Sequence, residues 1–115
     1  MTERTLTVLH REDPSGAVVL TVAGELDHHT APRLATVVRE APFAADEPTI
    51  IDLTELTYCD STGLTVLVAA YQRSKEKGGA LTLAGLNTDV MQLFKIVGFD
   101  QIFTFAPTVA EAIGA

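Results

Sequence analysis

Residues 49–53, with the sequence Thr-Ile-Ile-Asp-Leu, form a short β-branched run that is apolar on both sides of an extended chain. A strand of this kind is typical of the centre of a parallel sheet whose two faces are covered by helices. Helical spacing on either side of the run supports this interpretation. Apolar residues recur at i, i+3, i+4 and i+7 in the preceding set Leu34, Val37, Val38 and Ala41 and in the following set Leu64, Leu67, Val68 and Tyr71. The sequence therefore predicts an α/β fold.

The rest of the chain continues this alternation of strands and helices. Strand-like runs lie at residues 5–10, 17–23, 49–53, 80–84 and 102–105, and a third helical stripe comprises Val90, Leu93, Phe94 and Val97. Helix and loop boundaries are marked by Thr30, Pro32, Pro42, Pro48, Gly78, Gly79, Asn87 or Thr88, Gly98, Pro107 and Thr108. A turn signal at 13–16 predicts that the first two strands pair antiparallel. The predicted order is ββαβαβαβα, with helices packed against a mixed, mostly parallel sheet.

Length and composition restrict the kind of protein this chain can be. With 115 residues and neither a linker nor a repeat, residues 1–115 are expected to form a single domain. No apolar run reaches the roughly 18 residues that span a bilayer, and the N-terminus lacks the features of a signal peptide. The single cysteine, Cys59, cannot form an internal disulfide. We therefore expect a cytoplasmic protein without membrane association.

The charge of the chain argues against nucleic-acid binding. The formal net charge is −7, and the chain holds only eight Lys and Arg residues, whereas nucleic-acid binders concentrate basic residues. The group Arg73, Lys75 and Lys77 is interpreted as the solvated C-terminal end of a helix, where the helix dipole favours cations. No cofactor motif is present, and an acidic surface suits contacts with other proteins.

The polar stretch at residues 58–64, Tyr-Cys-Asp-Ser-Thr-Gly-Leu, precedes the second helical stripe. Asp, Ser and Thr are all preferred at helix starts, because their side-chain oxygens accept backbone N–H bonds. One cap is enough, and here three candidates stand in a row. The stretch also follows a buried strand, so it is expected at the carboxyl edge of the sheet, where α/β proteins place functional groups. Residues 60–63 therefore form a candidate site.

Catalytic and metal-binding interpretations of this region are weak. A nucleophile elbow around Ser61 needs glycine two residues before and two residues after the serine, and Cys59 occupies the first of these positions. His28 and His29 are the nearest candidate bases. Adjacent histidines on an extended chain point to opposite faces, so they rarely share one metal ion. We expect no enzyme activity and no metal site, and we interpret His28 and His29 as solvated loop residues. The one remaining functional interpretation of the loop that begins at Asp27 is contact with a partner.

Modification of Ser61 is the third interpretation. A phosphoryl group at a helix N-terminus meets free N–H groups and the positive end of the dipole, worth about 0.3–1 kcal/mol when exposed. The neighbouring Asp60 opposes it by like-charge repulsion, so the two effects roughly offset each other and the modified fold should survive. The surface, however, gains about −1.5 to −2 charges. A partner that binds this surface would therefore be released.

Two motifs together resemble a known family. Gly-Glu-Leu-Asp-His-His-Thr at 24–30 and Asp-Ser-Thr-Gly-Leu at 60–64 resemble the STAS domain of anti-sigma factor antagonists, small bacterial regulators of sporulation and general stress sigma factors. The resemblance covers essentially the whole chain and implies the STAS fold. It implies that the unmodified protein binds an anti-sigma factor, which is an ATP-dependent serine kinase, and so frees a sigma factor. It also implies that phosphorylation by this kinase abolishes binding and that a PP2C-type phosphatase reverses it.

The resemblance assigns roles to individual residues. Ser61 would be the phosphorylation site, with Thr62 as a minor alternative. Asp60 would orient the serine hydroxyl or help the kinase take its proton, and Gly63 would let the kinase backbone approach. The residues implied to lie on the neighbouring contact loop are Asp27, His28 and Thr30. The family often has a second serine where Thr62 stands. An alternative role within the same fold is that of a STAS scaffold subunit in a stress-sensing or transport complex without sigma-factor switching.

Overall fold

The computed structural model describes residues 5–41, 43 and 46–114. Its elements in chain order are β1 (Leu6–Glu12), β2 (Val18–Leu26), α1 (Ala31–Glu40), β3 (Thr49–Asp52), β4 (Leu56–Cys59), α2 (Ser61–Glu76), β5 (Leu81–Ala84), α3 (Thr88–Ile96), the 3-10 turn η1 (Phe99–Gln101), β6 (Thr104–Ala106) and α4 (Val109–Ile113). The predicted α/β architecture is confirmed, with one strand more than the sequence indicated. Pro42, expected at the start of a loop, lies outside the described residues.

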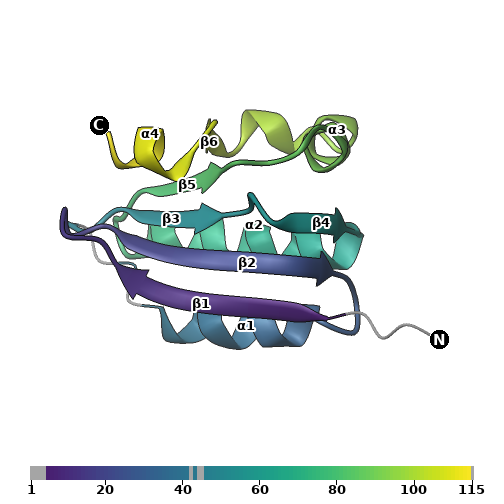
Figure 1. The fold of residues 1–115 in the computed structure, drawn as a ribbon, viewed down its shortest axis with the longest axis horizontal. Helices are drawn as coiled ribbons and strands as arrows, with labels where there is room; N and C mark the ends of the chain where they lie inside the picture. Colours follow the sequence, from purple (N-terminus) through teal and green to yellow (C-terminus); the bar gives the residue numbers. More distant parts are fainter. Residues whose placement is uncertain (1–4, 42, 44–45, 115) are drawn as a thin grey trace.

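Within the described residues, the strands form one sheet in the order β1-β2-β3-β5-β6, and β4 pairs with β2 off this path (Figure 1). The β1 and β2 strands are antiparallel, as predicted, and every other pair is parallel. The hairpin turn is closed by the backbone N–H of Gly16, which donates to the Asp13 carbonyl. The sheet is thus mixed and mostly parallel, so the carboxyl ends of β2, β3, β4 and β5 point the same way.

The strand β4 is the element that the sequence did not predict. It continues the line of β3 along β2, with Thr21 opposite Asp52 in the first pair and Gly24 opposite Leu56 in the second. Between the two strands the Asp52 carboxylate accepts hydrogen bonds from the backbone N–H and the hydroxyl of Thr54, at 3.0 and 2.6 Å. This Asx-type turn interrupts the strand. The short segment beyond it has two exposed residues in its middle, so its sequence lacks the alternation that would indicate a strand.

The strand β2 runs three residues further than predicted, to Leu26. Gly24 looked like the end of the strand, but it lies inside it with φ at 110°. A side chain there would collide with the backbone carbonyl of Thr5, so the position needs glycine. The register between β2 and β4 shifts by one residue at this point. Leu26 is fully buried, and the loop that follows therefore begins beside the end of β4.

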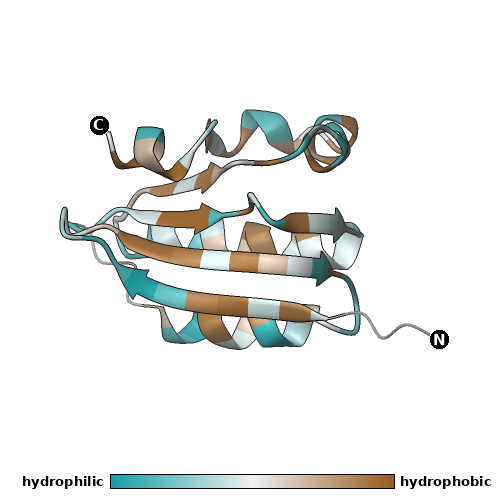
Figure 2. Ribbon diagram, viewed as in Figure 1, coloured by the Kyte–Doolittle hydropathy of each residue, from teal (hydrophilic) through white to brown (hydrophobic). Residues whose placement is uncertain are grey.

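Helices cover one face of the sheet and only part of the other, where Leu9 of β1 is 61% exposed. The α1 and α2 helices pack against each other and lie behind the sheet in Figure 1, and their apolar stripes, brown in Figure 2, enter the main core. Leu34, Leu64 and Leu67 are at most 2% exposed, and burying each stabilises the fold by about 1.5–3 kcal/mol. The opposite face carries a smaller cluster of Ala17, Val19, Ile50 and Ala84 with Val109, Ala112 and Ile113 of α4.

The last third of the chain departs from the prediction in two places. Val97, the last residue of the predicted α3 stripe, is 43% exposed because the helix ends at Ile96 and Val97 is its C-terminal cap. The last strand begins at Thr104 rather than Ile102, since the chain first makes a 3-10 turn after Gly98. In the described part of the chain, no helix has the length and apolar character needed to cross a bilayer.

Candidate functional site

The candidate residues come together where β2 and β4 end. Leu26 is the register partner of Cys59, and the backbone N–H of Asp60 donates to the Leu26 carbonyl at 3.1 Å. Residues 27–30 and 60–63 therefore leave neighbouring parallel strands at the same edge of the sheet (Figure 1). The predicted site residues Asp27, His28, Thr30, Asp60, Ser61, Thr62 and Gly63 all lie in these two segments.

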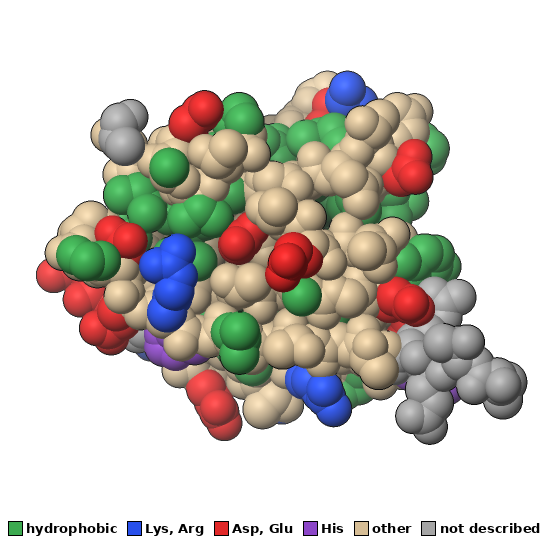
Figure 3. All heavy atoms as spheres, viewed as in Figure 1, with side chains coloured by type: hydrophobic (Ala, Val, Ile, Leu, Met, Phe, Trp, Pro, Cys, Tyr) green, Lys and Arg blue, Asp and Glu red, His purple; other side chains and the backbone are tan. Residues whose placement is uncertain are grey.

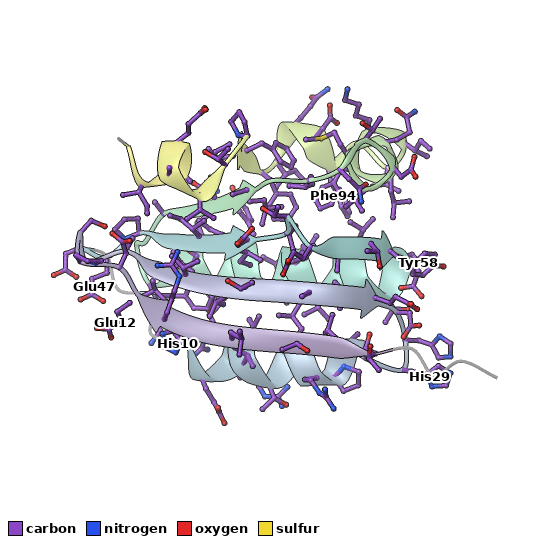
Figure 4. The ribbon with its side chains drawn as sticks, viewed as in Figure 1. His10, Glu12, His29, Glu47, Tyr58 and Phe94 are labelled. Atoms are coloured by element: carbon purple, nitrogen blue, oxygen red, sulfur yellow. The ribbon has the colours of Figure 1, made fainter. Side chains whose placement is uncertain are left out.

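The two ends of the sheet differ in their side chains. Figure 4 shows His29 and Tyr58 at the end that carries the candidate site, and Glu12 and Glu47 at the opposite end. Acidic side chains gather at that opposite end in the space-filling view of Figure 3. The negative charge of the chain is therefore partly concentrated away from the candidate site.

Asp60 is the residue that caps α2. Its carboxylate accepts the backbone N–H of Gly63 at 3.0 Å, and its carbonyl accepts the N–H of Leu64 at 3.1 Å. The helix itself begins at Ser61, earlier than the expected start near Leu64. Ser61 and Thr62 are both exposed on its first turn. The hydroxyl of Ser61 is thus displayed at the positive end of a helix whose start is held by another residue.

Gly63 is buried beneath the first turn of α2. A Cβ atom at this position would lie 2.7 Å from the Leu26 Cγ and 3.0 Å from the Cys59 Sγ. Both neighbours belong to the core and cannot easily move. The glycine therefore lets the first turn of α2 approach the ends of β2 and β4. Its implied contact with a kinase stays a prediction.

Cys59 lies directly under the candidate site. Its side chain is 9% exposed, and its Sγ is 3.5 Å from the Asp60 carbonyl oxygen. Burial raises the pKa of the thiol to about 12, and the negative charge of Asp60 adds to the effect. The thiol therefore stays protonated near neutral pH and acts as a small packing group rather than a nucleophile.

Asp27 organises the turn that follows β2. Its side chain is only 3% exposed, and its Oδ1 accepts the backbone N–H groups of His29 and Thr30 at 2.9 and 3.1 Å. The Thr30 hydroxyl accepts the Asp27 N–H at 2.9 Å and donates to the Glu25 carbonyl at 2.7 Å. Four hydrogen bonds among these residues thus fix the turn in one shape.

Thr30 marks the start of α1 as expected, but its side chain does not cap the helix. Thr30 occupies the N-cap position, and its hydroxyl makes no cap hydrogen bond. The hydroxyl points back to the turn, and the N–H groups that it could cap are not free, because Pro32 has none and that of Arg33 donates to the Thr30 carbonyl at 3.0 Å. Pro32 lies in the first turn as expected and has no N–H to satisfy. Thr30 therefore shapes the loop rather than the helix start.

The expectation that His28 and His29 point to opposite faces is wrong. Their ring centroids are 4.0 Å apart, with an angle of 38° between the ring planes, because residues 27–30 form a turn rather than an extended strand. No group of three metal-ligating side chains is found among the residues that the structure describes. The paired imidazoles are instead exposed to solvent on this turn.

A groove of about 370 Å³ runs between α1 and α2 and ends at this pair of loops. It is lined by His28, Ala31, Pro32, Ala35, Thr36, Arg39, Thr62 and Val66. His28 belongs to the turn after β2, and Thr62 belongs to the first turn of α2. These two segments therefore share one surface as well as one edge of the sheet. The groove is the structural link between the turn after β2 and the first turn of α2.

A second groove, of about 320 Å³, lies on the other side of β4 and was not foreseen from the sequence. Tyr58 of β4 and Ile96 of α3 line it and are 43% and 72% exposed. Exposed apolar side chains near a polar site suit contact with another protein. The sequence carried no signal for this groove, because it forms only once β4 is placed beside α3.

Comparisons with known proteins identify the family. The model of the STAS domain matches residues 9–112. The anti-sigma-B factor antagonist of Listeria monocytogenes is 33% identical over 104 residues, which cover 90% of this chain and 91% of the relative. The anti-sigma F factor antagonist of Paenibacillus polymyxa is 30% identical, with 91% of each chain covered.

The fold is shared with a solved structure as well. The crystal structure of an anti-sigma factor antagonist from Mycobacterium paratuberculosis superposes with a TM-score of 0.79 at 28% sequence identity, covering 95% of this chain and 92% of that one. The resemblance that the two motifs indicated is thus confirmed across almost the whole chain. The chain belongs to the STAS domain family, and within it to the group of anti-sigma factor antagonists.

Proposed function

We propose that this protein is an anti-sigma factor antagonist that is switched by phosphorylation of Ser61. In its unmodified form, the surface made by the loop 27–30 and the first turn of α2 binds an anti-sigma factor and so releases a sigma factor. The observation that carries this proposal is the exposed Ser61 on the first turn of α2, whose start is held by Asp60. Two relatives that are 30–33% identical over nine-tenths of the chain carry the antagonist name.

The proposed modification is a phosphoryl transfer from ATP, catalysed by the anti-sigma factor acting as a serine kinase. The Ser61 Oγ attacks the γ-phosphorus of ATP, the bond to ADP breaks, and the hydroxyl proton passes to a base. Asp60, the residue before the serine, would orient the hydroxyl or help to take this proton. Thr62 is a minor alternative acceptor. A PP2C-type phosphatase would hydrolyse the phosphoserine and restore the binding form.

The modified chain should keep its fold, because the Asp60 carboxylate bonds to Gly63 and this contact does not involve the Ser61 hydroxyl. The change is confined to the surface, which gains about −1.5 to −2 charges. Burying such an anion in an interface without a matching cation costs several kcal/mol. The proposed interface also includes Asp27, His28 and Thr30, whose turn leaves the same edge of the sheet as the first turn of α2, so the added charge would act on the whole contact.

The test is phosphorylation by the cognate anti-sigma kinase with ATP, followed by mass spectrometry of the intact chain and its peptides. We expect one phosphate, carried by Ser61. The variant Ser61→Ala should lose it, whereas the matched control Thr62→Ala should keep it. A phosphate at a site other than Ser61 or Thr62 would refute the assignment. Stable binding to partners that is unaffected by ATP would instead favour a STAS scaffold subunit.

A further inference from the structure

We propose that His28 contacts the phosphoryl group on Ser61 and holds it at the mouth of the groove between α1 and α2. This inference rests on the proposed modification of Ser61. It assigns to His28 a role inside the modified protein, separate from any contact with a partner.

The placement of His28 follows from the pairing of β2 with β4. Leu26 and Cys59 are register partners, so His28 and Ser61 each lie two residues beyond the paired ends of neighbouring strands. The side chain of His28 lines the same groove as Thr62, the residue next to Ser61. His29 is not among the residues that line this groove, although its ring is 4.0 Å from that of His28. The geometry therefore distinguishes the two histidines.

The first turn of α2 has a reduced capacity to hold a phosphate by itself. The N–H groups of Gly63 and Leu64 already donate to the carboxylate and the carbonyl of Asp60. The Asp60 carboxylate also repels an added anion. A side-chain cation nearby would add a favourable interaction, because an imidazolium can donate a charge-assisted hydrogen bond to a phosphate oxygen. His28 is an exposed base in the adjoining loop.

The other ionisable groups near this site are two carboxylates and two basic side chains. Asp27 lies buried beneath the turn and Asp60 caps the neighbouring helix. Both carboxylates oppose a phosphate. Arg39 lines the same groove from α1, where its guanidinium donates to the Thr36 hydroxyl at 3.2 Å. His29 adds a second imidazole that would repel a protonated His28.

The contact should depend on pH. Histidine side chains as a class change charge near pH 6.5, and phosphoserine loses its second proton near pH 6. A protonated imidazole stabilises the phosphate dianion and therefore lowers the pH at which the dianion forms. The phosphate titration is thus a direct reporter of the contact.

The test uses phosphoserine placed at position 61 during translation, so that no kinase is needed. The phosphorus-31 chemical shift is followed from about pH 4 to about pH 9, a range that brackets both ionisations. Relative to the phosphoserine protein with both histidines, His28→Gln should raise the midpoint of the phosphate titration by about 0.3 unit or more. The matched variant His29→Gln should move it by less than about 0.1 unit.

Equal midpoints for the parent and His28→Gln would overturn the proposal, as would a shift in His29→Gln as large as that in His28→Gln. Both histidines are exposed, so neither change should disturb the fold. Because the phosphoserine is introduced directly, this result is independent of the kinase experiment. A phosphate on Ser61 without a His28 effect would leave the proposed function intact and remove only the contact.

Discussion

The carboxylate of Asp60 accepts the backbone N–H of Gly63 at 3.0 Å, across the exposed Ser61 and Thr62 that stand between them. The helix start is therefore held by a residue that phosphorylation of Ser61 leaves unchanged. This arrangement explains the surplus of helix-capping residues at 60–62. One of them caps the helix, and the hydroxyls beside it are exposed to solvent and to partners.

Asp60→Ala should lower the free energy of unfolding by about 1 kcal/mol, because the Gly63 N–H loses its acceptor. Asp60→Asn should retain most of the stability, since an asparagine oxygen can accept the same bond. Ser61→Ala is the matched control and should change stability by less than about 0.5 kcal/mol. Urea denaturation measures all three variants. A loss in Ser61→Ala equal to that in Asp60→Ala would show that the serine contributes to the cap.

Gly63→Ala should destabilise the protein by about 1–3 kcal/mol. In an open helix the same change would stabilise by about 1 kcal/mol. Here the added Cβ would lie 2.7 Å from the Leu26 Cγ, and Leu26 is fully buried and cannot move aside. The steric effect should therefore prevail over the gain in helix propensity. Denaturant titration measures whether the free energy of unfolding falls or rises.

The cause of that loss can be checked with a second change. Leu26→Ala removes the Cγ and Cδ2 atoms that the new methyl group would meet. The loss in the Gly63→Ala and Leu26→Ala double variant should therefore be smaller than the sum of the single losses by about 0.5 kcal/mol or more. Additive losses would mean that the contact between residues 63 and 26 is not responsible.

Cys59 should make stability fall at alkaline pH. Its ordinary pKa is 9.0, and burial raises the pKa in the folded protein to about 12. A raised pKa means that the unfolded chain releases the proton first, so the contribution is complete below pH 9 and is lost as the pH rises from about 9 to about 12. Unfolding free energies measured from about pH 7 to about pH 10 should fall more steeply in the wild type than in Cys59→Ala. Parallel curves would contradict the assigned burial effect.

The sequence was informative about the elements whose signals are local. The stripe of α2, the hairpin turn at 13–16 and the buried run at 49–53 all depend on neighbouring residues, and each lies where it was expected. The strand β4 could not be predicted in this way. Its four residues have no apolar alternation, and its strand geometry comes from pairing with β2, which is far away in sequence.

The residues of the site could be predicted from the sequence, but their arrangement in space could not. The motifs at 24–30 and 60–64 named the two loops, whereas their proximity depends on the register of Leu26 with Cys59. The shape of the first loop also depends on side-chain hydrogen bonds within it, such as the one that the Thr30 hydroxyl donates to the Glu25 carbonyl. The sequence pattern does not show which of these bonds form. For that reason the side-by-side histidines were predicted incorrectly, and Thr30 marks the helix start without its side chain capping it.

The central claim, that charge at residue 61 controls partner binding while the fold is unchanged, is tested most directly by calorimetry with the cognate anti-sigma factor. Ser61→Ala should bind with an affinity close to that of the wild type, and Ser61→Asp should bind about tenfold more weakly or worse, a loss of about 1.4 kcal/mol. Ser15→Asp adds the same charge on the hairpin turn at the opposite end of the sheet and should bind as the wild type does. Equal affinities for Ser61→Ala and Ser61→Asp would contradict the account.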